Sequence, residues 1–266
     1  MEMYLPMAVK NVGLTLEDIL SHISGAEYKF LYYDKISSLY RQIGVGAYLI
    51  TDNAQAMFDM LELGIQSYIE FLEKAEDSEK AISKTAVFFD AVCCQNKTAM
   101  EKLAQLAPQQ LNPRKEYDED FLYMRILMDF FGLEKTRQDV QIMLDEYEKF
   151  HNDYPDERFN LIIALLDKND KAFHNSLELL TNERLGRYAK GGDLYEGTLE
   201  EASILSDVST EVMAWLWFAR FQNIDLGSKY ALAPDSAMQV CQTTPLAEGA
   251  WRSCESYRSL EYTDKE

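Results

Sequence analysis

Apolar residues recur at intervals of three and four positions along most of the chain, which is the spacing of one helical face. No segment alternates apolar and polar residues for long, as a half-buried strand would. The stripes are Met57, Leu61, Tyr68 and Leu72; Ile82, Ala86, Phe89 and Cys93; Phe121, Met124, Met128 and Phe131; Val140, Met143, Leu144 and Tyr147; Phe159, Ile162, Ile163 and Leu166; Phe173, Leu177 and Leu180; and Leu205, Val208, Val212, Leu216 and Ala219. This pattern predicts an all-α fold of about ten antiparallel helices, in a compact bundle or as stacked αα-hairpins.

Residues that begin and end helices fit this pattern. Two threonines are each followed three positions later by glutamate, the sequence of a capping box, and a third threonine starts a weaker version. The predicted starts are Asp52 or Asn53, Thr98, Thr198, Thr15 as the weaker box, and Pro155 as a first-turn residue; the predicted ends are Gly132 and Gly191–Gly192.

Three segments depart from the regular stripes. Residues 43–50 are apolar enough for a strand, although Gly44 and Gly46 weaken that interpretation. Residues 212–219 are apolar on every side, which predicts a buried helix at the centre of the C-terminal part. Residues 108–116 contain Pro113 and a run of charges, and they are the best candidate for a hinge. We expect a single domain over residues 1–266, with lobes at 1–110 and 115–266.

The chain is strongly acidic, and its negative charge is concentrated in two segments. The formal net charge is -19, from 45 Asp and Glu against 26 Lys and Arg. Residues 116–157 contain 13 acidic and 4 basic residues, and residues 191–219 contain 6 acidic and no basic residues. Such a field repels nucleic acid and anionic lipid and attracts a basic protein surface. A well-solvated acidic surface without a partner would have the same composition.

Cysteine use and hydropathy indicate a cytoplasmic protein without a membrane span. The four cysteines contain no C-x-x-C pair, and Cys93 lies on an apolar stripe, so we expect it to be a small buried hydrophobe. No apolar run approaches the roughly 18 residues of a transmembrane helix. The first residues lack the basic region and long apolar run of a signal peptide.

Catalytic and cofactor motifs are missing from the sequence. It contains no glycine-rich phosphate loop and no G-x-S-x-G nucleophile motif. Glu148 and His151 form one E-x-x-H, but a di-iron bundle needs two such motifs and two further carboxylates. We therefore expect no enzyme activity, no cofactor and no metal.

The order of several segments resembles a known family. Residues 84–103 (KTAVFFDAVCCQNKTAMEKL) precede 118–123 (DEDFLY), 159–177 (FNLIIALLDKNDKAFHNSL), the acidic loop 191–197 (GGDLYEG) and 215–220 (WLWFAR). This succession, across roughly residues 80 to 235, resembles the immunity protein 49 family of bacterial polymorphic-toxin systems. The resemblance implies an all-α antidote that binds a cognate toxin domain, and it implies no active-site residues.

The resemblance and the charge together predict where a toxin would bind. Many such toxins are nucleases with basic grooves, which an acidic surface could mask. Tyrosines among the acids, Tyr117, Tyr147, Tyr154 and Tyr195, suit an interface, although for any single one ordinary partly buried packing is the simpler explanation. The candidate toxin-binding residues are Glu116, Asp118, Glu119, Asp120, Asp145, Glu148, Asp153, Tyr154, Asp156, Asp193, Tyr195, Glu196 and Glu200.

Two other interpretations remain open at this point. One is a helical adaptor without a toxin partner, although no repeat of 34 or about 40 residues is present. The other is a helical metalloenzyme with a site around Glu148 and His151. The partner we predict is a toxin protein rather than nucleic acid or membrane, and the oligomeric state is left open.

Overall fold

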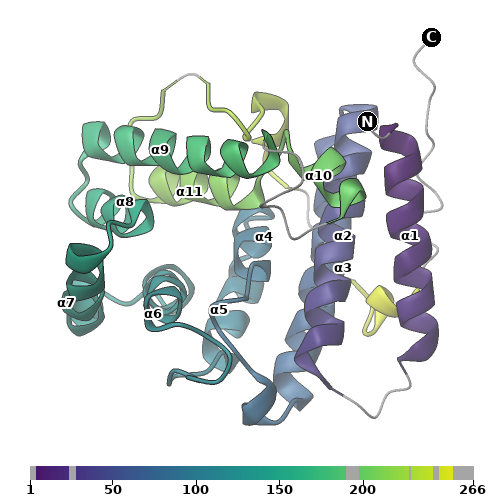
Figure 1. The fold of residues 1–266 in the computed structure, drawn as a ribbon, viewed down its shortest axis with the longest axis horizontal. Helices are drawn as coiled ribbons and strands as arrows, with labels where there is room; N and C mark the ends of the chain where they lie inside the picture. The colour runs from purple at the N-terminus through teal and green to yellow at the C-terminus, as the bar shows by residue number, and fades with distance from the viewer. Residues whose placement is uncertain (1–3, 24–27, 190–197, 228, 242–245, 254–266) are drawn as a thin grey trace.

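A computed structural model describes residues 4–23, 28–189, 198–227, 229–241 and 246–253 (Figure 1). These residues form α-helices and no strand, so the predicted all-α fold is confirmed. The α-helices are α1 (Leu5–His22), α2 (Phe30–Thr51), α3 (Ala54–Lys74), α4 (Val87–Cys93), α5 (Lys97–Leu106), α6 (Asp118–Leu127), α7 (Arg137–Asp153), α8 (Glu157–Leu166), α9 (Asp170–Ala189), α10 (Leu199–Leu205) and α11 (Thr210–Phe221). Short 3₁₀ turns lie at Asp77–Glu79, Asp235–Ala237 and Ala250–Arg252, and one π-helical turn lies at Met128–Gly132.

The first three helices stand side by side on one side of the molecule (Figure 1). The chain reverses between α2 and α3 through Asp52, which has a left-handed backbone, and Asn53, whose side chain accepts a hydrogen bond from the Gln55 N–H. This confirms the start predicted at this pair. All four residues of the stripe from Met57 to Leu72 are buried. The long α2–α3 hairpin is therefore the frame on which the rest of the fold packs.

Residues 43–50 belong to helix α2 and do not form a strand. Their glycines allow close packing. A Cβ atom at Gly44 would lie 2.9 Å from the Met57 carbonyl oxygen of α3, and one at Gly46 would lie 2.2 Å from a Val9 methyl group of α1. Because neighbours crowd this part of α2 on two sides, its residues are apolar all round and show no helical period.

Helix α11 is buried at the centre of the C-terminal part of the molecule, as its uniformly apolar sequence predicted. Residues from Val212 to Ala219 are all buried. In Figure 1 α11 and α9 run one beside the other above α4 and α6, and α8 lies to the left of α11. The predicted stripe from Leu205 to Ala219 is divided between α10 and α11, because the chain leaves the helix between them.

Several of the predicted helix starts are wrong by a few residues. Asn96 caps α5 in place of Thr98, and Asp156 caps α8 one residue after Pro155. Thr15 lies inside α1, where its hydroxyl donates to the Asn11 carbonyl. Thr198 does cap α10, and its hydroxyl accepts from the Glu201 N–H at 3.2 Å. Where two capping residues lie close together, the sequence does not indicate which one the helix uses.

Buried residues from all the α-helices join in one apolar cluster, and Cys93 is among them as predicted. Residues 108–116 connect α5 to α6, and the end of the π-helical turn at Gly132 confirms the stop predicted there. The stop predicted at Gly191–Gly192 falls outside the described residues. Within the described part of the chain, no helix has both the length and the apolar character that crossing a membrane requires.

Candidate protein-binding surface

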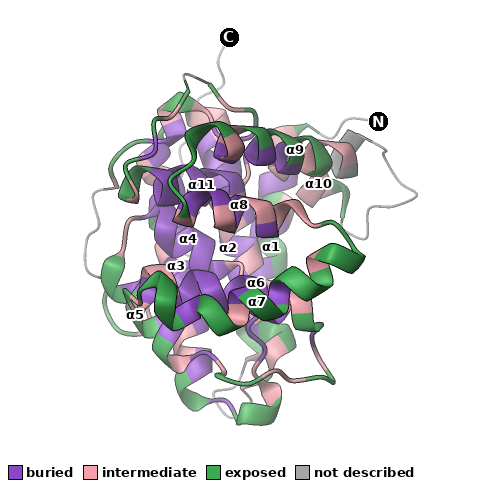
Figure 2. Cartoon of the chain, turned by 90° about the vertical axis from the view of Figure 1, so that its left-hand side faces the viewer, coloured by how far each residue is buried: buried purple, intermediate pink, exposed green. Residues whose placement is uncertain are grey.

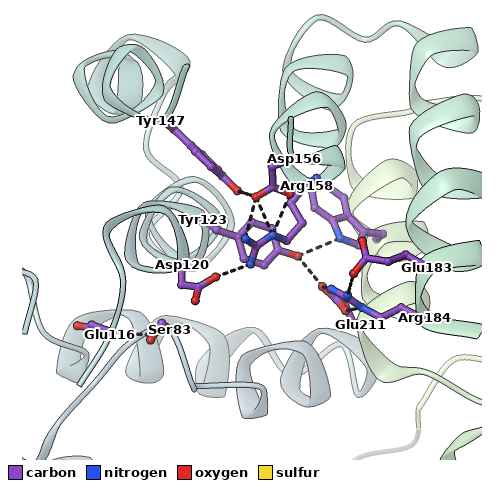
Figure 3. Close-up of polar contacts among 11 residues, drawn as sticks. Ser83, Glu116, Asp120, Tyr123, Tyr147, Asp156, Arg158, Glu183, Arg184 and Glu211 are labelled. Carbon is purple, nitrogen blue, oxygen red and sulfur yellow. Dashed lines mark hydrogen bonds and ion pairs between the residues drawn. The ribbon is translucent and has the colours of Figure 1, made fainter. Parts of the chain in front are cut away.

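Arg158 organises the polar side chains between α6, α7 and α8 (Figure 3). Its guanidinium donates to Asp156 Oδ2 at 2.7 Å and to Asp120 Oδ1 at 2.7 Å, and it lies over the Tyr123 ring. The Tyr147 hydroxyl donates to the same Asp156 carboxylate at 2.7 Å. Burial would raise the pKa of Asp156, but the adjacent Arg158 guanidinium holds it below its usual value.

A second ion pair continues this network toward α9 and α11. Arg184 donates to Glu211 at 2.8 Å, and the Tyr123 hydroxyl donates to the same carboxylate at 3.0 Å. The Trp215 indole N–H donates in turn to the Tyr123 oxygen. Burial opposes ionisation of Glu211, yet Arg184 keeps the pKa of this carboxyl below its ordinary value. These contacts join α6, α9 and α11 through satisfied buried groups.

Three of the predicted toxin-binding residues serve this internal structure. Asp120 and Asp156 share the Arg158 guanidinium, which offsets one of their two negative charges within the chain. Glu116 is buried, and its carboxylate accepts hydrogen bonds from the backbone N–H groups of Ser83 and Asn112. Their contacts hold the loop before α6 and the start of α8.

Other predicted residues do lie on the surface. Asp118 begins α6 and is exposed, and Glu119 beside it is partly exposed. Asp145, Glu148 and Asp153 are exposed along α7. Among the tyrosines, Tyr117 and Tyr154 are exposed at the ends of this region, whereas Tyr147 is fully buried. The structure thus exposes acids at the N-terminus of α6 and along α7, two helices that pack together, and Asp118 lies near Glu146 of α7. We call these exposed residues the acidic surface of α6 and α7.

The second acidic segment lies elsewhere. Glu200 is in α10, which packs against α1 and α2, and its carboxylate accepts a hydrogen bond from Asn11. In Figure 1 α10 lies beside α2, whereas α7 lies at the opposite side of the molecule. Asp193, Tyr195 and Glu196 fall outside the described residues. The two acidic segments therefore do not form one continuous site through Glu200.

The E-x-x-H pair is not arranged as a metal site. Glu148 is exposed, whereas the His151 ring lies against Phe159 and its Nδ1 accepts from the Asp156 N–H at 3.0 Å. In the part of the chain that the structure describes, no group of three or more His, Cys, Asp or Glu residues is placed to hold a metal ion. Through this hydrogen bond His151 stabilises the turn between α7 and α8.

The charge pattern missed apolar residues on the same surface. Ile142 and Phe150 are both exposed on α7, and neither is an acid or a tyrosine. Ile142 lies two positions away from buried Val140 and Leu144, which places it on the outer side of the helix. Helical spacing counted from Val140 could have identified it.

Comparison with known families identifies the chain. The family model described as immunity protein 49 matches residues 38–237, most of the sequence. The comparisons found no match among curated proteins or among solved structures. The matched residues include α3 to α11 and thus the whole acidic surface of α6 and α7. The chain belongs to the immunity protein 49 family.

Proposed function

We propose that this protein binds a cognate antibacterial toxin domain and neutralises it by covering its active surface. Membership of an immunity protein family is the observation that carries this proposal. Neutralisation requires no chemistry by this chain, because a bound protein excludes the substrate by occupying its place. The cytoplasmic location expected from the sequence is part of the same proposal.

The exposed acids of α6 and α7 support a basic partner, such as a nuclease. Asp118, Asp145, Glu148 and Asp153 lie on this surface, and no ion pair within the described residues engages them. A nuclease groove carries Arg and Lys residues that hold phosphates. Opposite charges on the two proteins speed their encounter and align the surfaces before close contact.

A protection assay tests this function. The product of the gene immediately upstream, tested as the cognate toxin, is expressed in a sensitive strain with and without the protein. We expect growth to be restored by the wild-type chain. A variant that combines Asp145→Asn, Glu148→Gln and Asp153→Asn should protect less, because it loses three exposed charges.

A matched control removes the same charge outside α6–α8. Asp207→Asn, Asp225→Asn and Asp235→Asn also neutralise three exposed acids, and we expect this variant to protect fully. Equal loss of protection in both triple variants would show that net charge matters and the α7 surface does not. Failure of the wild-type chain to protect would refute the toxin assignment itself.

A further inference from the structure

Helix α7 has an outer face that nothing in the described structure covers. Of its 17 residues, only Val140, Leu144 and Tyr147 are buried. Figure 2 views the molecule from the side of α7, which crosses this face as a largely exposed helix. A helix of a globular protein usually hides a broader stripe than this. The remaining surface of α7 is available to another molecule.

Ile142 lies in the middle of this outer face. This residue is 73% exposed. At 100° per residue, Ile142 points away from the direction of the buried Val140, Leu144 and Tyr147, and Glu146, Lys149 and Asp153 lie on its side of the helix. A branched apolar side chain in water gains free energy when a partner covers it. Ile142 is therefore suited to anchor a complex.

The charges around Ile142 are mostly of one sign. Asp145, Glu146, Glu148 and Asp153 are exposed on α7 without an ion pair in the described part of the chain. Lys149 is the basic residue among them. The other two charged side chains are already engaged, since Arg137 pairs with Asp167 and Asp139 closes a capping box with Thr136. An apolar centre with an acidic border is complementary to an apolar socket bordered by Arg and Lys.

Helix α1 is a useful comparison and differs from α7 in two respects. It also exposes apolar side chains, with Met7 at 56% and Leu14 at 52%. Its acids Glu17 and Asp18 are accompanied by Lys10, so the local charge is smaller. The range Leu5–His22 also lies before residue 38, where the family match begins. These differences favour α7 over α1 as the surface that binds a toxin.

We propose that α7 is the docking helix for the toxin, with Ile142 inserting into an apolar socket that cationic side chains surround. This inference rests on the proposed function and specifies the chemistry of its partner. Anchors of this kind lie at the centre of an interface, where polar neighbours exclude water from them. The acids of α7 contact the Arg and Lys residues at the border of the socket.

Ile142→Asp and Leu14→Asp provide a matched pair of variants. Both place a carboxylate on the exposed face of a helix, and neither removes a buried contact. The probe is the product of the gene immediately upstream, tested as the cognate toxin and inactivated by substitution, and its dissociation constant is measured by biolayer interferometry. We expect Ile142→Asp to weaken binding about 30-fold or more, as loss of a central anchor does, and Leu14→Asp to leave it within about twofold. Ile142→Gln, which adds no charge, should weaken binding in the same direction.

The outcomes separate this inference from the proposed function. If the wild-type chain binds and protects while both Ile142 variants bind equally well, α7 is not the docking helix and the immunity function stands. If Leu14→Asp weakens binding instead, the docking face is α1. If the wild-type chain does not bind the toxin, the function itself fails and the inference with it. Circular dichroism of each variant establishes that it is folded.

Discussion

Replacement of Arg158 by methionine tests whether the polar network between α6, α7 and α8 stabilises the fold. Methionine keeps much of the apolar stem over the Tyr123 ring but removes the cation that Asp120 and Asp156 share. The side chains of Arg158 and Asp156 are 22% and 19% exposed. Their pairing is thus largely shielded from water, and the two carboxylates would be left without their counter-ion.

The size of the expected destabilisation follows from the burial of this ion pair. Removal of one partner from a buried ion pair costs about 3–5 kcal/mol, and partial exposure of this pair favours the lower end of that range. We expect Arg158→Met to lower the free energy of unfolding by about 3 kcal/mol. For a chain of this size, that loss lowers Tm by about 6–12 °C.

Urea denaturation at pH 7 measures this loss, and Arg137→Met is the control. Arg137 also pairs with an aspartate, Asp167, but the two side chains are 43% and 46% exposed. An exposed pair contributes about 1 kcal/mol or less, so this variant should remain close to wild type. Equal destabilisation by the two variants would show that burial of the Arg158 pair has no special effect.

The pH dependence gives a second test of the same network. Because Arg158 lowers the pKa of Asp156, the pair stabilises the folded state above the unfolded value of 3.8, and this contribution is lost as pH falls through the folded pKa. The difference in unfolding free energy between wild type and Arg158→Met should therefore shrink below about pH 4. Addition of Asp156→Asn to the Arg158→Met variant should recover part of the loss at pH 7, because it removes one unpaired carboxylate. A gap that stays constant down to pH 2 would contradict this explanation.

Two further predictions concern the α2–α3 hairpin. Gly44→Ala should destabilise the protein by about 1–3 kcal/mol, because the new methyl group meets the Met57 carbonyl of α3. The control Gly186→Ala lies in α9, where nothing is within 4 Å of the new methyl group, and should stabilise the protein by up to about 1 kcal/mol. Thermal unfolding of both variants checks this, and a stabilising Gly44→Ala would refute the close approach of α2 and α3. Glu70 of α3 accepts hydrogen bonds from Arg252, Lys74 and Trp251, and these bonds lower its pKa to about 2. The stability that they provide should therefore be lost as pH falls from about 4.5 toward 2. Glu70→Gln should lack this part of the pH dependence in acid titrations of unfolding, and a Gln variant with the wild-type profile would exclude the contact as its source.

The helical fold could be predicted from the sequence because most helices here have one buried face. The stripe from Met57 to Leu72 in α3 is an example, and all of its residues are buried. The start of α5 was not predictable in the same way, since Asn96 and Thr98 are both good caps two residues apart. Residues 43–50 were ambiguous because tertiary neighbours on two sides of α2, rather than any local preference, require an apolar helix containing Gly44 and Gly46.

The negative charge of this surface could be predicted from the sequence, but the acids that belong to it could not. A charge count treats every carboxylate alike, whereas folding pairs Asp120 with Arg158, a residue 38 positions away in the chain. Glu116 was equally indistinguishable in sequence from Asp118, although one is buried in a loop and the other is exposed. Which acids remain free depends on long-range contacts that neither composition nor helical spacing contains.

The dependence of toxin association on salt tests the central claim most directly. The association rate of the wild-type chain with the product of the gene immediately upstream, tested as the cognate toxin, is measured by stopped flow between about 0.05 and 0.5 M salt. If the acids of α6 and α7 attract a basic surface, the rate should fall at least about tenfold over this range, and it should fall less for the variant with Asp145→Asn, Glu148→Gln and Asp153→Asn. A rate that is independent of salt for both proteins would contradict electrostatic masking.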